Sequence, residues 1–101
     1  MFAVLYRFEI KPGDDEAFVA SWAEATRAIK AHHRHRGSRL HQDERGGWFA
    51  YTVWESREKW QARTEGPAPL QRALARMGEH VERVEVLHEL EVRADLLDGG
   101  S

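Results

Sequence analysis

Residues 48–54, with the sequence WFAYTVW, are the stretch that decides the fold. Its aromatic and β-branched composition is typical of a strand, in which successive side chains point to opposite faces. Apolar side chains occupy both faces: Trp48, Ala50 and Trp54 on one, Phe49, Tyr51 and Val53 on the other. A strand with one face in water alternates apolar with polar residues. We therefore expect both faces of this strand to be covered.

The segments before this strand predict a strand, a long helix and a second strand. Residues 2–10 alternate at period two and end at Pro12-Gly13. A helix that begins at Gly13 or Asp14 is then expected to reach about residue 33, because one apolar stripe spans it: Phe18, Trp22, Ala25 and Ile29. Its histidine-rich end is followed by Gly37, for which we expect a left-handed conformation. Residues 38–44 predict a weaker strand, joined to residues 48–54 by a Gly46-Gly47 hairpin turn.

The segments after this strand predict two helices and a last strand. Ser56 is expected to cap a short helix that carries Trp60. Beyond Pro67 and Pro69, a second apolar stripe predicts an amphipathic helix: Leu70, Leu74, Met77 and Val81. Residues 84–93 alternate again, with Val84, Val86, His88, Leu90 and Val92 on one face.

The element order β-α-β-β-α-β predicts an α+β, ferredoxin-like fold with a four-stranded antiparallel sheet and two helices on one face. We expect one domain over residues 1–94 and a flexible tail over residues 95–101. Since the helices can cover only one face of the sheet, a second copy of the chain is expected to cover the other face. The sequence thus predicts a homodimer.

Composition excludes several classes of function. The chain has 101 residues, with 15 Lys plus Arg against 17 Asp plus Glu, so its charge offers no general attraction for nucleic acid or an anionic membrane. The absence of cysteine excludes disulfides, a thiol nucleophile and thiolate metal sites. No apolar run approaches the roughly 20 residues of a membrane span. We expect a cytoplasmic protein.

The sequence resembles the antibiotic biosynthesis monooxygenase (ABM) family over residues 2–93. The segment Val53-Trp54-Glu55-Ser56, followed by Trp60, carries most of the resemblance, together with residues 2–10, the Pro12-Gly13 turn, the helix that contains Trp22, and Gly37-Ser38. The resemblance implies a dimeric α+β barrel with a pocket between the sheet and the helices of each protomer.

The resemblance also implies three alternatives for function. Some family members oxygenate aromatic polyketides with O₂ and no cofactor, and this gives our first hypothesis: a monooxygenase acting on a small aromatic, phenolic or polyketide-like molecule. A non-enzymatic dimer that binds a small apolar metabolite is the second. Haem binding or degradation is the third, but the strand-one Asn of the haem-degrading members falls on Tyr6 here and their Trp falls near Arg63.

Three residues are candidates for catalysis. Tyr6 is a phenol on an apolar strand face, suited to stabilise a developing oxyanion. His88, on the apolar face of the last strand, and His80, near the end of the second long helix, are candidate bases. A flat slot for the aromatic ligand is predicted from five further side chains: Phe8, Trp22, Tyr51, Trp54 and Trp60.

The remaining histidines predict no metal site. His32, His33 and His35 cluster at a helix C-terminus, where cationic groups complement the helix dipole, and no carboxylate or thiolate completes a ligand set with them or with His41. Ser56 and Lys59 have the spacing of serine-lysine hydrolases, but an N-cap explains that serine fully. We expect no cofactor.

Overall fold

The computed structural model describes residues 1–97. Its elements are β1 (Phe2–Ile10), α1 (Asp15–His33), β2 (Gly37–Gln42), β3 (Trp48–Trp54), α2 (Arg57–Gln61), α3 (Ala68–Gly78) and β4 (Val81–Glu91). This order confirms the predicted α+β arrangement, with α2 as the short third helix. Residues 98–101 of the predicted flexible tail lie outside the described range.

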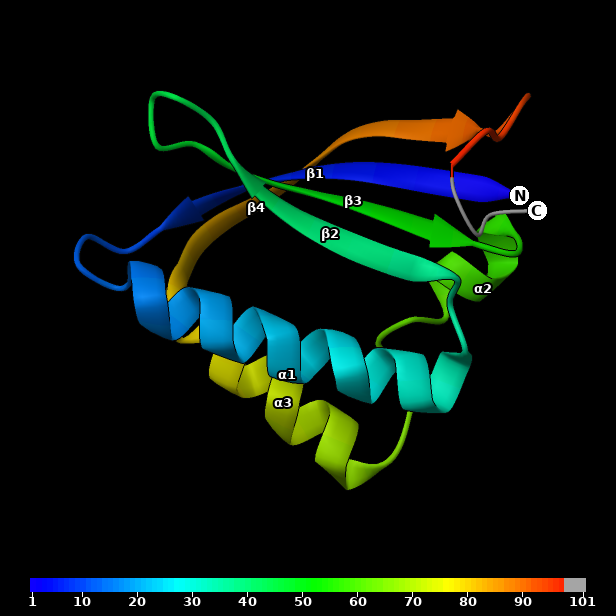
Figure 1. Ribbon diagram of the computed structural model, residues 1–101. Coiled ribbons are helices and arrows are strands. Elements are labelled where there is room, and N and C mark those ends of the chain that lie inside the picture. Colours follow the sequence, from blue (N-terminus) through cyan, green and yellow to red (C-terminus); the bar gives the residue numbers. More distant parts are fainter. Residues whose placement is uncertain (98–101) are drawn as a thin grey trace.

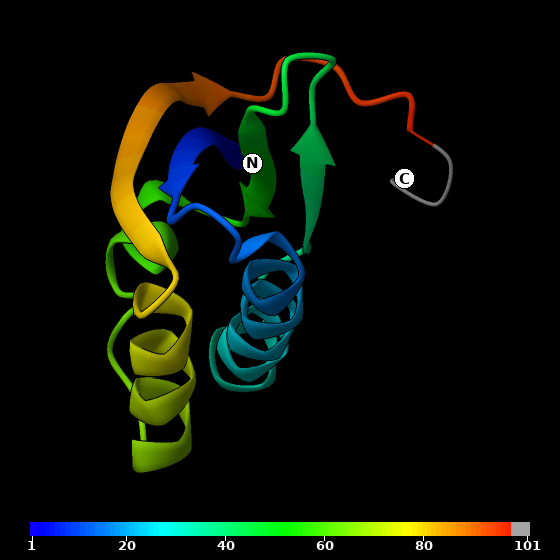
Figure 2. The ribbon, with the colours of Figure 1, turned by 90° about the vertical axis from the view of Figure 1, so that its left-hand side faces the viewer.

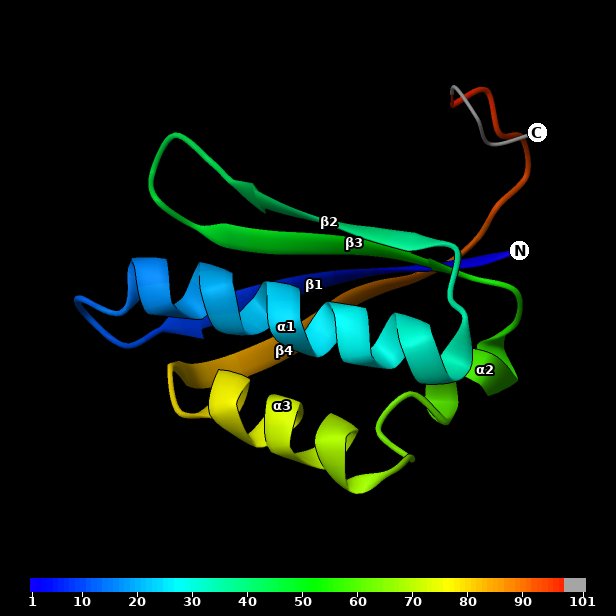
Figure 3. The same cartoon turned by 60° about the horizontal axis from the view of Figure 1, so that its bottom comes forward.

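The four strands form one antiparallel sheet in the order β2-β3-β1-β4. The two long helices, α1 and α3, lie side by side against one face of the sheet (Figures 1 and 3). Figure 2 shows the two layers end-on, and within residues 1–97 the opposite face carries no helix. We call this opposite side the open face. No helix in this part of the chain has the length and apolar character needed to cross a membrane.

The core lies between the sheet and the helices, where the predicted patterns place it. Alternate residues of β1 are buried on the helix side, and they pack against Phe18 of α1 and Trp54 of β3: Phe2, Val4, Tyr6 and Phe8. Phe18 is 0% exposed and Trp54 is 2% exposed. At about 25 cal/mol per Å² of buried apolar surface, such aromatic side chains dominate the stabilisation of a chain this small.

The helix ends follow local sequence signals, with one correction. Ser56 accepts a hydrogen bond from the Lys59 backbone N–H at 3.2 Å and so caps α2 as predicted. Pro67 and Pro69 stand at the start of α3, where their missing N–H groups leave no hydrogen bond unmade. The left-handed residue that ends α1 is Arg34 (φ 56°) rather than Gly37, which begins β2 with φ 146°.

A bulge in β4 corrects the predicted face of His88. Leu5 pairs with His88 and Tyr6 pairs with Val86, so Leu87 is an extra residue between them. Because directly paired residues share a face, His88 lies with Leu5 on the open face, whereas Val86 lies with Tyr6 on the helix side. The predicted continuous face from Val84 to Val92 is therefore wrong. The strand also begins earlier than predicted, so Val81 belongs to β4 and not to α3.

Candidate functional site

A cavity of about 310 Å³ lies between the helix side of the sheet, the two long helices and the segment that follows α2. Its wall is mainly apolar, with side chains from α1, α3 and all four strands. Seven polar residues interrupt this wall: Tyr6, Thr26, His35, Ser38, Thr52, Arg63 and Thr64. An apolar cavity with a few polar groups is the usual form of a site for a small organic molecule.

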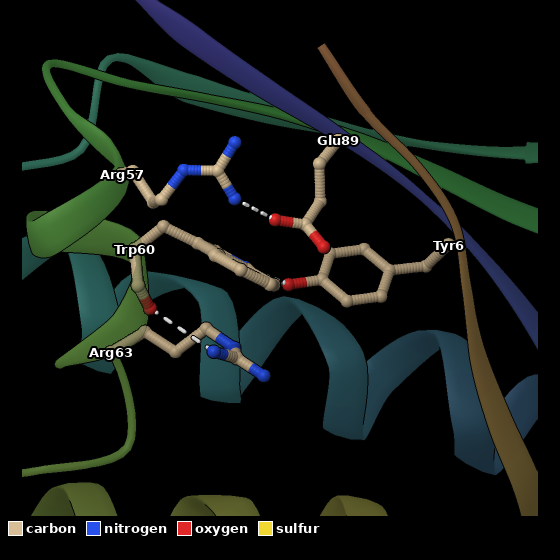
Figure 4. A network of polar contacts seen from close by, with 5 residues as sticks. All are labelled: Tyr6, Arg57, Trp60, Arg63 and Glu89. Carbon is tan, nitrogen blue, oxygen red and sulfur yellow. Dashed lines mark hydrogen bonds and ion pairs between the residues drawn. The ribbon is translucent and has the colours of Figure 1, made fainter.

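Tyr6 lines the cavity at its β1 wall and is 8% exposed. Its hydroxyl oxygen accepts a hydrogen bond from the indole N–H of Trp60 on α2 (Figure 4). An indole N–H only donates, so the Tyr6 oxygen must be the acceptor in this pair. The Tyr6 proton remains available, and within residues 1–97 no protein acceptor takes it. Burial raises the pKa of the Tyr6 hydroxyl above its ordinary value of 10.0, which keeps it a donor at neutral pH.

Charged side chains surround the Tyr6–Trp60 pair (Figure 4). Arg63 lies over the Trp60 ring, 4.5 Å from its centroid, and donates to the Trp60 carbonyl oxygen at 3.1 Å. Glu89 of β4 forms an ion pair with Arg57. Burial and the Trp60 hydrogen bond have the largest effects on the pKa of Tyr6. The charges of Arg63 and Glu89 have smaller effects in opposite directions, since Arg63 lowers this pKa and Glu89 raises it. Glu89 points to this side of the sheet because the β4 bulge reverses the alternation.

His35 and Ser38 are residues of this site that sequence patterns missed. His35 follows α1 by two residues, is 5% exposed, and lines the cavity with its ring edge-on to Trp54, the centroids 4.9 Å apart. Burial lowers the pKa of the imidazole below its ordinary value of 6.5, so His35 is neutral at pH 7. Its sequence position groups His35 with the other histidines at the C-terminal end of the helix. The polar run of residues 32–36 carries no signal that one of its members turns inward.

The predicted ligand-binding residues separate into three groups. Phe8, Trp22 and Trp54 line the cavity. Trp60 lies behind Tyr6 as its hydrogen-bond donor. Tyr51 is on the open face, paired with Leu5, and does not line this cavity.

Neither predicted base reaches the cavity. His88 is exposed on the open face. His80 lies at the turn between α3 and β4, where its Nδ1 is 3.0 Å from a carboxylate oxygen of Asp14. The structure therefore does not bring Tyr6 together with His80 or His88, and His35 is the histidine that shares a cavity with Tyr6.

The remaining histidines have local roles. The Nε2 of His33 is 2.6 Å from the carbonyl oxygen of Glu65, which ties the end of α1 to the segment between α2 and α3. His32 and His41 are exposed. In the portion of the chain that the structure describes, no group of three or more possible metal ligands occurs.

The buried His35 predicts a pH-dependent stability. Its pKa is lower in the folded than in the unfolded chain, so below pH 6.5 the unfolded chain binds more protons. We therefore expect the melting temperature to fall as the pH is lowered from 7 to 5. The variant His35→Leu should lose this part of the pH dependence, whereas His32→Gln, at an exposed position, should retain it. An unchanged profile in His35→Leu would contradict the buried, neutral state.

Comparison with known proteins identifies relatives of this architecture. The model of the antibiotic biosynthesis monooxygenase family matches residues 1–76. Among solved structures, a Bordetella bronchiseptica protein assigned to these monooxygenases is 18% identical, with a TM-score of 0.77 over 92% of this chain and 97% of that one.

Two further solved structures have the same fold. SnoaB, a cofactor-independent oxygenase from Streptomyces nogalater, is 15% identical (TM-score 0.72, 94% of this chain and 95% of that one). Rv0793 from Mycobacterium tuberculosis is 23% identical (TM-score 0.68, 92% and 98%). No curated protein matches the sequence.

Proposed function

Because the chain belongs to the antibiotic biosynthesis monooxygenase family, we propose that it is a monooxygenase that oxidises a small phenolic aromatic molecule with O₂ and without a cofactor. The similarity in fold to SnoaB, a cofactor-independent oxygenase, supports the reaction class. The apolar cavity with two Trp side chains in its wall, Trp22 and Trp54, supports an aromatic ligand.

The observation that carries the proposal is the Tyr6 hydroxyl. Tyr6 lines an apolar cavity, and its hydroxyl oxygen accepts from Trp60. Within residues 1–97 no protein group accepts the hydroxyl proton, so we infer that this proton is available to a bound molecule. A donor held in advance in a site of low polarity stabilises negative charge that develops on a reacting oxygen. The indole N–H groups of Trp60 and Trp54 cannot share this role, because they donate to Tyr6 and to the Thr52 hydroxyl.

The proposed reaction needs only the substrate and O₂. Loss of the phenolic proton gives an anion that transfers one electron to O₂, and the two radicals combine to form a C–O bond at a ring carbon. Cleavage of the O–O bond then leaves a quinone carbonyl at that carbon and releases the second oxygen as water. The phenolic and ring hydrogens both end in that water, and the substrate supplies all the electrons. The chain would bind the ring, exclude water and stabilise the peroxide through Tyr6.

Oxygen uptake tests this proposal. We expect the protein to consume O₂ with at least one member of a set of phenols and naphthols, 1-naphthol included, and to transfer one atom of ¹⁸O₂ to the product. Ala25→Leu, which places a larger side chain in the cavity wall, should slow this reaction. Ala20→Leu, on the exposed side of α1, is the matched control and should not. Uptake that yields only hydrogen peroxide, or none with any compound, would contradict the proposal.

A binding protein for an apolar metabolite is the second candidate function. The mainly apolar wall of the cavity favours it, since binding such a molecule requires no reacting group. The same experiment separates the two functions: a protein that binds naphthols without consuming O₂ belongs to the second class.

A further inference from the structure

Two residues that line the cavity each carry a buried polar atom without a hydrogen-bond partner: Nδ1 of His35 and Oγ of Ser38. More than about 90% of buried polar groups in proteins are paired, because an unpaired one costs about 1–3 kcal/mol. Among residues 1–97, these are the only buried side-chain nitrogen or oxygen atoms in this condition. Both belong to residues that line the same cavity, and this makes one bound molecule a candidate partner for both atoms.

The fold places His35 and Ser38 at the same end of β2. Ser38 pairs with Thr52 of β3, so the two hydroxyl side chains lie next to each other on the helix side of the sheet. The Thr52 oxygen accepts from the Trp54 indole N–H at 3.2 Å. The ring of His35 packs edge-on against the same Trp54. Trp54 thus contacts both Thr52 and His35. Between His35 and Ser38, the backbone N–H of Arg36 donates to the Val53 carbonyl oxygen at 2.9 Å.

The hydrogen-bonding capacity of this pair selects a hydroxyl group. A neutral imidazole offers one donor and one acceptor nitrogen, and a serine hydroxyl can both donate and accept. A ligand hydroxyl can therefore donate to His35 while it accepts from Ser38. A ligand without such a group would leave both buried atoms unpaired.

We propose that His35 and Ser38 form a subsite that binds a hydroxyl group on an aromatic ligand, whose ring lies against the Trp side chains of the cavity. The inference rests on the proposed function for the identity of the ligand, a phenol. It adds the place where the phenolic hydroxyl binds and the group, His35, that accepts its proton. This subsite replaces the bases predicted from sequence, His80 and His88, which lie outside the cavity.

Calorimetric titration with three probes of similar size tests the subsite. Naphthalene has no hydroxyl, 1-methoxynaphthalene has an oxygen that accepts but cannot donate, and 1-naphthol does both. We expect the wild-type protein to bind 1-naphthol about 10-fold more tightly than naphthalene, which corresponds to hydrogen bonds with a net contribution of about 1.4 kcal/mol. The methoxy compound can accept from Ser38 but cannot donate to His35, so it should bind at most about 3-fold more tightly than naphthalene. Titration without O₂ prevents turnover.

Two variants and one control assign the preference to residues. His35→Leu should abolish the preference for 1-naphthol, and Ser38→Ala should reduce it about 3-fold, with naphthalene affinity retained in both. Ser21→Ala is the matched control, because Ser21 is also buried but its hydroxyl donates to the Phe18 carbonyl at 3.0 Å and lies outside the cavity. It should keep the full preference.

The outcomes distinguish this inference from the proposed function. Equal binding of 1-naphthol and naphthalene by the wild type, absence of binding of either, or an unchanged preference in both His35→Leu and Ser38→Ala overturns the subsite. If His35→Leu fails to fold, the affinities of Ser38→Ala for 1-naphthol and of the wild type for 1-methoxynaphthalene still test the subsite. A hydroxyl preference that depends on these residues, in a protein that consumes no O₂, would support the subsite and overturn the oxygenase.

Discussion

Replacing Tyr6 by Phe is expected to lower the rate of oxygenation about 100-fold, the loss typical for a donor that stabilises a developing oxyanion. The ring of Tyr6 packs in the core with Phe8, and Phe preserves that packing. Only the hydroxyl is removed, and with it the donor that we propose for the developing oxyanion. Oxygen uptake under saturating substrate measures the rate.

The same replacement is also expected to destabilise the protein, which separates structural from catalytic effects. Tyr6→Phe leaves the buried N–H of Trp60 without its acceptor, at a cost of about 1–3 kcal/mol in the free energy of unfolding. Trp60→Phe is the matched variant: it removes the same hydrogen bond but keeps the Tyr6 hydroxyl. A stability loss in both variants, with the larger rate loss in Tyr6→Phe, is the expected result. Equal rates in the wild type and Tyr6→Phe would remove Tyr6 from the mechanism.

We propose that two copies of the chain pair through their open faces, so Val53→Glu is expected to raise the dissociation constant of this dimer at least about 100-fold by burying an unpaired charge. Val53 lies on the open face of the sheet beside two further apolar residues, Leu5 and Tyr51. Leu90, also on this face through its pairing with Ala3, is 40% exposed in the single chain. These side chains lie on the face of the sheet that the helices do not cover.

Light scattering at micromolar concentration checks this expectation, since the chain has a mass of 11.7 kDa and the dimer twice that. Val19→Glu is the control, because Val19 is an exposed valine of α1 (41% exposed) on the outer surface of the helix layer. It should leave the dimer intact. A wild-type protein that scatters as a monomer would refute the sheet-to-sheet dimer.

The elements of the fold could be predicted because their signals are local. The alternation in β1, the aromatic and β-branched run of β3, the cap at Ser56 and the prolines before α3 each act over a few residues. Each coincides with an observed element boundary or face. The left-handed residue was misplaced because Arg34, which has no intrinsic preference for that conformation, takes it where the helix gives way to β2.

The site could be predicted only where it follows from those alternating patterns. Tyr6, Phe8 and Trp54 were placed correctly because regular strands fix their faces. His35 could not be, since it lies in an irregular connection whose direction depends on tertiary packing against Trp54. His88 was assigned to the wrong face because a bulge is a backbone irregularity that alternation does not reveal.

The bulge at Leu87 has a consequence for how site residues are transferred between relatives. Beyond the bulge, each residue points to the face opposite to the one that simple alternation predicts. Glu89 therefore lies on the cavity side and His88 on the open face. Two homologous chains whose β4 sequences differ only by this extra residue would therefore present different side chains to the cavity. The family match ends at residue 76, before this strand begins. The face of each β4 residue should accordingly be assigned from the β1 residue with which it pairs, and not from its position in the sequence.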